Sequence, residues 1–159
     1  MNRQLLGIYL NDHLAGAMGG LELARRALRN NRGTPLATDL ERIVKEIEED
    51  RVALEGLMER LRIPRSPVKA PVAWALEKVG RLKLNGRLLE YSPLSRVVEL
   101  ELLSSGVETK RAMWTALKRL ADEGVDLGLD LEDLIARARR QRRVIDRRRL
   151  EAAAAAFDA

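Results

Sequence analysis

Apolar residues recur at three- and four-residue steps along most of the chain, which is the spacing of one face of an α-helix. The first such stripe predicts a helix over residues 4–29, and Asn30, Asn31 and Gly33 favour its end. Three glycines interrupt the stripe, and we expect them to let a neighbouring helix approach closely: Gly16, Gly19 and Gly20. The chain therefore opens with one long helix that has a small-residue segment near its middle.

Three further long helices follow from the same pattern. Thr34-Pro35 and Ser92-Pro93 each join a capping residue to a first-turn proline, and Asp130 is a favourable cap for the last helix. The apolar stripes behind these starts cover residues 36–61, 97–121 and 131–152. The alanine run at 152–156 extends the last helix by propensity.

The connections predict how these helices are arranged. Short links join the first helix to the second and the third to the fourth, so each pair is expected to be antiparallel. About 30 residues separate the second and third long helices, and they include a short helix predicted over residues 71–82. The sequence therefore predicts one all-α domain over residues 1–159, a four-helix bundle with a single long crossover that contains a short extra helix.

Composition narrows the chemistry available to such a bundle. The chain has no cysteine and one histidine, which excludes disulfides and thiolate metal sites and argues against multi-histidine metal cages. No apolar run approaches the roughly 18 residues of a membrane-spanning helix. The N-terminal segment lacks the basic-then-apolar layout of a signal peptide, so we expect a cytoplasmic protein.

Two segments, YLNDHLAGAMGGLELARR and EIEEDRVALEGLMERL, together with the predicted architecture, resemble bacterial ferritin-like proteins. The resemblance implies a metal motif with one Glu on the first and third helices and Glu-x-x-His on the second and fourth. Here the second helix carries Glu46 followed by Glu49 in place of His, and the middle of the fourth helix offers neither residue. The metal motif is therefore degenerate.

A degenerate motif favours a non-catalytic bundle without a cofactor, which acts as a binding or protein-interaction module. Its partner would be another protein or a second copy of the chain, as in a dimer, and not a membrane. The alternative is an atypical metal-binding ferritin-like enzyme with these candidate ligands: His13, Glu46, Glu49 and Asp50.

Four polar residues interrupt or border the apolar stripes at similar heights: His13, Asp50, Lys110 and Arg142. At about 100° and 1.5 Å per residue, we expect them to form one buried polar layer where the relatives hold metal. A lysine or arginine there would neutralise Asp50, because an unpaired buried charge is costly. In the other interpretation, the long basic side chains reach out to solvent between the helices and never meet.

Two basic segments give further candidates. The connector before the third long helix offers an anion-binding site at Lys83, Arg87 and Ser92, since helix N-termini attract anions. Residues 137–149 hold eight Arg and one Asp within a chain of net charge +5. Their exposed face could serve a nucleic-acid accessory protein through Arg140, Arg143 and Arg147. A helix face paired with carboxylates of the second helix is the simpler interpretation, so nucleic acid is not favoured.

Overall fold

The computed structural model describes residues 2–66 and 91–158, which form four long helices and contain no strand. The helices are α1 (Arg3–Asn30), α2 (Pro35–Arg60), α4 (Pro93–Asp122) and α5 (Leu131–Phe157). The predicted all-α class is confirmed for this part of the chain, while the short helix predicted over 71–82 lies outside the described residues. None of the described helices is long and apolar enough to cross a membrane.

The predicted helix starts are confirmed. Ser92 accepts a hydrogen bond from the Ser95 amide at 3.1 Å, and Asp130 accepts one from the Asp133 amide at 2.9 Å. Thr34 is the N-cap residue of α2 by position, but its hydroxyl donates to a carbonyl of the preceding turn instead of capping α2. The helix boundaries thus follow local cap and proline chemistry, which the sequence contains in full.

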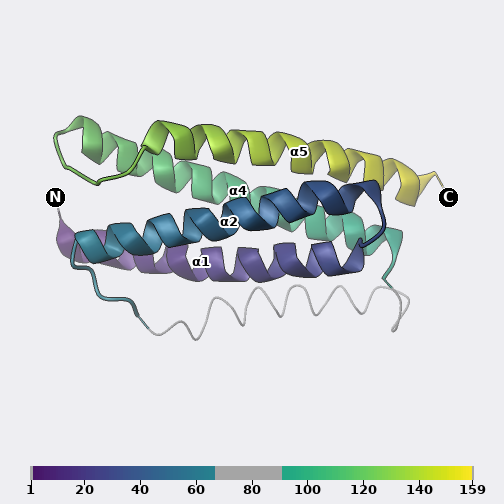
Figure 1. The fold of residues 1–159 in the computed structure, drawn as a ribbon, viewed down its shortest axis with the longest axis horizontal. Helices are drawn as coiled ribbons and strands as arrows, with labels where there is room; N and C mark the ends of the chain where they lie inside the picture. The colour runs from purple at the N-terminus through teal and green to yellow at the C-terminus, as the bar shows by residue number, and fades with distance from the viewer. Residues whose placement is uncertain (1, 67–90, 159) are drawn as a thin grey trace.

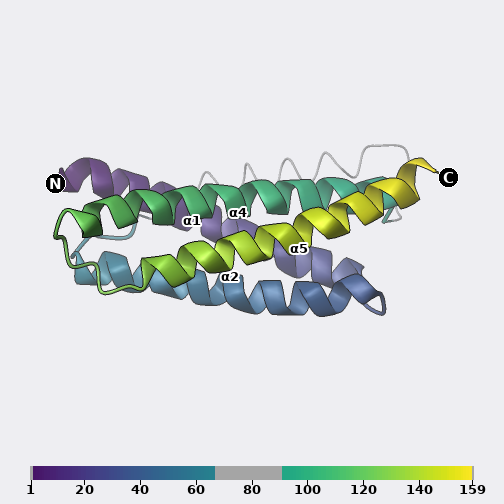
Figure 2. The ribbon, with the colours of Figure 1, turned by 90° about the horizontal axis from the view of Figure 1, so that it is seen from above.

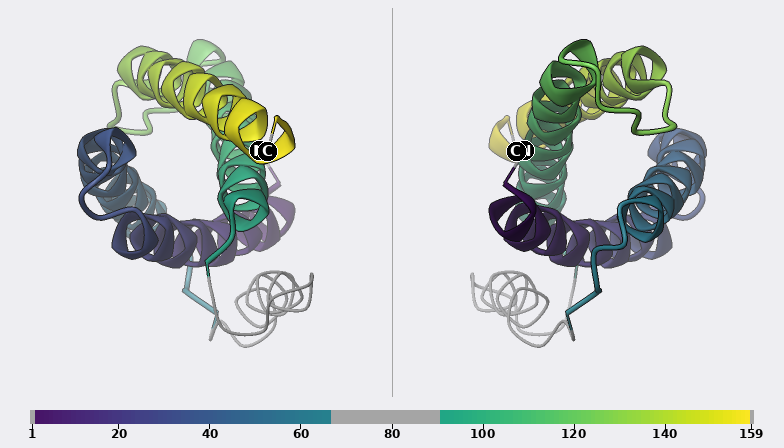
Figure 3. Two further views of the ribbon diagram at one scale, coloured as in Figure 1. Left: turned by 90° about the vertical axis from the view of Figure 1, so that its right-hand side faces the viewer. Right: turned by 90° about the vertical axis from the view of Figure 1, so that its left-hand side faces the viewer.

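The four helices lie side by side along the long axis of the molecule (Figures 1 and 2). Each of α1·α2, α1·α4, α2·α5 and α4·α5 is a packed pair, and the end views show the helices as a ring in the order α1, α2, α5, α4 (Figure 3). α1 is antiparallel to α2, and α4 to α5 (Figure 1). α2 ends at the end of the bundle opposite to the start of α4, so these two helices run in the same direction (Figure 1).

The core consists of two apolar clusters, one toward each end of the bundle. The first includes Leu10, Leu14, Leu54, Met58, Trp114 and Leu117. The second includes Leu21, Ala24, Ile43, Leu100, Val107 and Ile145. Between them, at mid-height, lie two of the buried polar residues, Asp50 of α2 and Gln141 of α5. The stripes of the helices therefore meet as predicted, and polar side chains interrupt the core at one level.

Candidate functional site: a buried ion pair beside a pocket

Lys110 of α4 reaches across the bundle core to Asp50 of α2, and the two side chains form an ion pair. The side chain of Asp50 is 1% exposed and that of Lys110 is 14% exposed. The ammonium also donates to Oε1 of Gln141 on α5 at 2.6 Å. One cation therefore joins three of the four helices at the mid-height level predicted from the helix turns.

Arg137 and Gln141 of α5 complete the polar layer. Nη1 of Arg137 lies 3.3 Å from Oδ1 of Asp50 and 3.0 Å from Oε2 of Glu49. The Gln141 amide donates to Glu46 at 3.0 Å and lies 3.5 Å from Oδ2 of Asp50. Both oxygens of Asp50 thus have charged partners, which is the condition for keeping a carboxylate in a core.

Burial opposes the charge on Lys110. Removal of its ammonium from water lowers the pKa of Lys110 below its ordinary value, and the charge and hydrogen bond of Asp50 work in the opposite direction. Three carboxylates, those of Asp50, Glu46 and Glu49, accompany the two cations of the layer, Lys110 and Arg137. The layer is therefore a set of mutually paired polar groups within an apolar core.

The other two predicted residues, Arg142 and His13, do not join the layer. The prediction for Arg142 is wrong, because its side chain is 45% exposed and its guanidinium binds Glu108 of α4 at 2.6 Å. It lies at the edge of the stripe that faces α4, and its long side chain carries the charge to the surface. His13 is half-buried and makes edge contact with Tyr9, with ring centroids 4.5 Å apart, and forms no hydrogen bond to a described residue.

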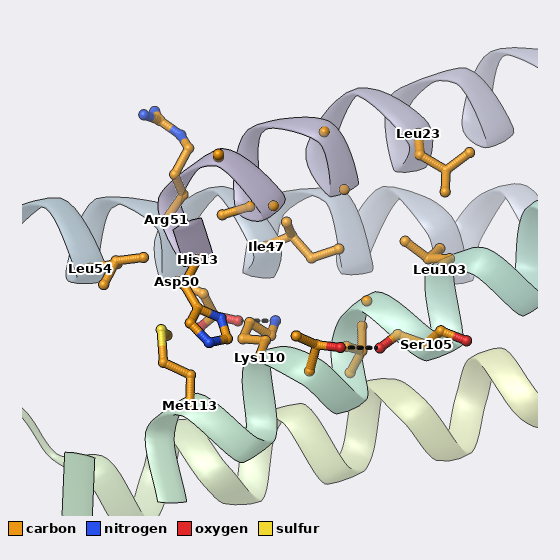
Figure 4. A pocket seen from close by; sticks show the side chains of 18 of the residues that line it. His13, Leu23, Ile47, Asp50, Arg51, Leu54, Leu103, Ser105, Lys110 and Met113 are labelled. Carbon is orange, nitrogen blue, oxygen red and sulfur yellow. Dashed lines mark hydrogen bonds and ion pairs between the residues drawn. The ribbon is translucent and has the colours of Figure 1, made fainter. Parts of the chain in front are cut away.

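A pocket of about 520 Å³ opens beside the layer, between α1 and α4 with α2 behind them (Figure 4). His13 points into it from α1, and Lys110 and Met113 line it from α4 (Figure 4). Its remaining walls are largely small or apolar, among them Ala15, Gly16, Gly20, Leu23, Leu54, Leu103, Gly106 and Val107. The layer and the pocket share Asp50 and Lys110, so they form one site.

Gly16 and Gly20 of α1 do not bring a neighbouring described helix close, which corrects the expectation from the sequence for these two positions. A Cβ atom added at Gly16 or Gly20 would meet no described atom within 4 Å, and the same holds for Gly106 on α4. These positions instead leave open space along the pocket. Missing side chains on two facing helices are the physical origin of the pocket.

The donor on Trp114 has no partner. Trp114 is fully buried and lines the pocket, and its Nε1 is the one buried side-chain polar atom without a hydrogen-bond partner in the described residues. Trp114 packs in the core as its stripe position predicts. A lone unpaired indole N–H, however, could not be predicted from the sequence.

The alternative metal set does not converge. Each candidate carboxylate of α2 has another partner. Glu46 accepts a hydrogen bond from Gln141. Glu49 lies 3.0 Å from the Arg137 guanidinium, and Asp50 is paired with Lys110. Within residues 2–66 and 91–158, no group of three or more His, Asp or Glu side chains is arranged to hold a metal ion. The carboxylates of α2 are instead paired with side chains of α4 and α5, and none of them contacts the imidazole of α1 by a hydrogen bond.

A second buried polar cluster, which the sequence did not reveal, lies near the start of α4. Glu99 is 1% exposed, accepts from the Tyr91 hydroxyl at 2.9 Å and pairs with Arg26 of α1 at 3.0 Å. Asn31 donates to the same hydroxyl at 2.9 Å and accepts from Arg96 at 2.6 Å. Burial raises the pKa of Glu99 above its ordinary value, and its hydrogen bonds and the two arginines lower it. Every partner is satisfied, so this cluster is an anchor between α1 and α4.

The arginine-rich face of α5 is largely paired. Arg147 lies 3.6 Å from Asp39 of α2 and Arg140 lies 3.7 Å from Asp133, while Arg143 is exposed and has no ion pair among the described residues. The carboxylates of α2 that serve this face are Asp39, Glu49 and Asp50. In the predicted anion site, Ser92 caps α4, and Lys83 and Arg87 lie outside the described residues.

Comparisons with protein-family models, with curated proteins and with solved structures find no match to this chain.

Proposed function

We propose that this chain is a ferritin-like helical bundle that has exchanged metal chemistry for binding, and that it acts as a binding or protein-interaction module. The order and direction of α1, α2, α4 and α5 support the ferritin-like part of the proposal, because α2 and α4 run the same way and are joined by a long connection. The pocket supports the binding part, since cavities of about 300–1,000 Å³ are the size that small ligands use.

One observation carries the proposal: the ammonium of Lys110 lies at mid-bundle between Asp50 and Gln141. In the ferritin-like proteins that the sequence resembles, this level holds metal ions bound by inward carboxylates. A divalent cation brought here would meet the charges of Lys110 and Arg137, and it would have to displace both from Asp50. A fixed protein cation therefore serves as the positive charge that a metal would otherwise supply.

Two alternatives remain as outcomes of tests. An atypical metal enzyme would need His13, Glu46, Glu49 and Asp50 to gather around one ion, which requires Lys110 to leave Asp50. A nucleic-acid accessory protein would need arginines of α5 to exchange their carboxylate partners for phosphates. Both require the breaking of ion pairs that the present arrangement contains, and neither has a specific contact in its favour.

The test is the metal content of the chain purified without a histidine tag. We expect elemental analysis to find far less than one iron or manganese per chain, before and after incubation with each ion followed by desalting. We also expect no change in the melting temperature on addition of Mn²⁺ or EDTA, because a metal that binds only the folded chain would raise it. One or two bound ions per chain, with a matching rise in melting temperature, would overturn the proposal.

A further inference from the structure

Two side chains border the pocket with N–H groups that no described residue accepts. The ammonium of Lys110 has three N–H groups, of which Asp50 and Gln141 take two. The imidazole of His13 points into the pocket and makes no hydrogen bond to a described residue. An unsatisfied buried donor costs about 1–3 kcal/mol, so a group that accepts from it gains a corresponding advantage.

The rest of the pocket wall suits an apolar body. Gly16 and Gly20 on α1 and Gly106 on α4 leave space where other residues would place side chains. Leu23, Leu103 and Val107 supply apolar surface farther along the same cavity. A ligand that fills this space therefore has a hydrocarbon part along the glycines and an oxygen-bearing end at Lys110.

The donors determine what that end can be. A carboxylate has two acceptor oxygens, which match the ammonium of Lys110 and an imidazole N–H of His13. An amine would bring a second cation and further donors beside the Lys110 ammonium. The oxygens of Asp50, the buried acceptor there, are already bound to Lys110 and Arg137.

An acid in the pocket needs a balancing positive charge. The cations of the layer are already paired with carboxylates, so an entering carboxylate needs one more positive charge, and His13 can provide it by taking up a proton. Burial lowers the pKa of His13 below its ordinary value, whereas the neighbouring Asp12 raises it. The charged and titratable groups around His13 are Tyr9 and Asp12 on α1, Asp50 and Arg51 on α2, and Lys110 on α4.

We propose that the pocket between α1 and α4 binds an apolar monocarboxylic acid, with its carboxylate at Lys110 and His13 and its hydrocarbon chain along the glycines. This inference rests on the proposed function, because it names the ligand class of the binding module. Three parts of this proposal can be tested separately: the acid group of the ligand, its apolar body and the place where it binds.

The first experiment compares three probes that share one hydrocarbon chain. Decanoate, 1-decanol and decylammonium are titrated into the full chain at pH 7 below their micellar concentrations, and binding is followed by calorimetry. We expect one decanoate per chain, with at least tenfold weaker binding of decanol and no binding of decylammonium. Equal binding of acid and alcohol, or no binding of decanoate, would overturn the proposal.

The second experiment places the ligand with a matched pair of variants. Gly20→Leu fills the pocket from α1, while Gly56→Leu adds the same side chain on α2 outside it; both added Cβ atoms meet open space. We expect Gly20→Leu to weaken decanoate binding at least tenfold and Gly56→Leu to leave it unchanged. Both substitutions replace a helical glycine by a better helix former, so both variants should fold. Equal binding by the two variants would place the ligand elsewhere.

The third experiment follows the proton. His13 is the single histidine of the chain, so its Cε1–H resonance reports its pKa without assignment. We expect an apparent pKa below 6.5 in the free protein and above it in saturating decanoate, but not in decanol. An unmoved histidine pKa would contradict the placement of the carboxylate.

Metal analysis on the same preparations separates the two proposals. If the chain contains no metal and does not bind decanoate, the proposed function stands and this ligand class is wrong. If the chain contains stoichiometric metal and binds decanoate in the same pocket, the proposed function is wrong and the ligand class stands.

Discussion

Replacement of Lys110 by Met is the sharpest test of the polar layer, because it removes the cation and keeps most of the side-chain length. Removal of one partner from a buried ion pair costs about 3–5 kcal/mol, since the other charge stays in the core. Asp50 retains Arg137 at 3.3 Å and Gln141 at 3.5 Å, so we place Lys110→Met at the lower end, about 3 kcal/mol. The Oε1 atom of Gln141 also loses its donor.

The double variant Asp50→Leu/Lys110→Met tells a coupled pair from two independent residues. With both charges gone, no unpaired charge remains at the pair, and apolar replacements of buried ion pairs are often neutral or stabilising. Arg137 keeps Glu49 at 3.0 Å and Asp133 at 3.4 Å, so it is not left alone. We expect the double variant to lie within about 1 kcal/mol of the original chain, which is a large departure from additivity.

The assay is urea unfolding followed by the helical circular dichroism signal, with ΔG and the m-value fitted for each chain. Lys118→Met is the matched control, because Lys118 is on the same helix and pairs with Asp122 at 2.8 Å near the surface. It should cost less than about 1 kcal/mol. Additive effects of the two core substitutions, or a cost for Lys110→Met no larger than that of the control, would refute the reasoning.

Two further predictions concern the charged surface. Hydrogen bonds from Arg111 and Arg142 lower the pKa of Glu108 to about 2, so its carboxylate stabilises the fold above its ordinary pKa of 4.5 and loses this effect as the pH falls toward 2. We expect Glu108→Gln to lower the free energy of unfolding by at most about 1 kcal/mol at pH 7 and to have no effect near pH 2, as measured by urea unfolding. A loss that persists near pH 2 would show that the charge of Glu108 is not its cause. The paired arginines of α5 predict no salt-dependent binding to duplex DNA, and a titration at about 50 mM salt whose affinity falls steeply with added salt would contradict this.

The helix starts could be predicted because their causes are local. Ser92, Pro93 and Asp130 act on the first turn of their own helices, and no distant residue changes that chemistry. The pairing of Asp50 with Lys110 could also be predicted, since both lie in apolar stripes at similar distances from the starts of helices that run the same way.

The rest of the site depends on where side chains end and on how the helices pack, and neither follows from the number of helical turns along the sequence. Gln141 is the buried residue at this turn of α5, so Arg142 lies at the edge of the stripe and reaches the surface. Arg137 also lies beside the stripe but reaches inward, because a long side chain can end far from its Cα. Gln141 carries no charge, so it gave no signal of a partner. Glycines such as Gly16 and Gly20 can allow close packing of a neighbouring helix or can leave open space. Which of the two occurs depends on the position of α4, which the sequence of α1 does not contain.

The layer and the pocket have a common physical origin. Asp50, Lys110 and Gln141 hold α2, α4 and α5 together at mid-height, and α1 adds no charged side chain to these contacts. At the same height α1 carries glycines, so polar contacts join three of the four helices and the space beside the fourth is left open. A bundle that needed only stability would gain from larger apolar residues at Gly16 and Gly20, because filled space adds contacts that empty space lacks. Their absence beside an ammonium with a spare donor is the combination that a ligand-binding bundle requires.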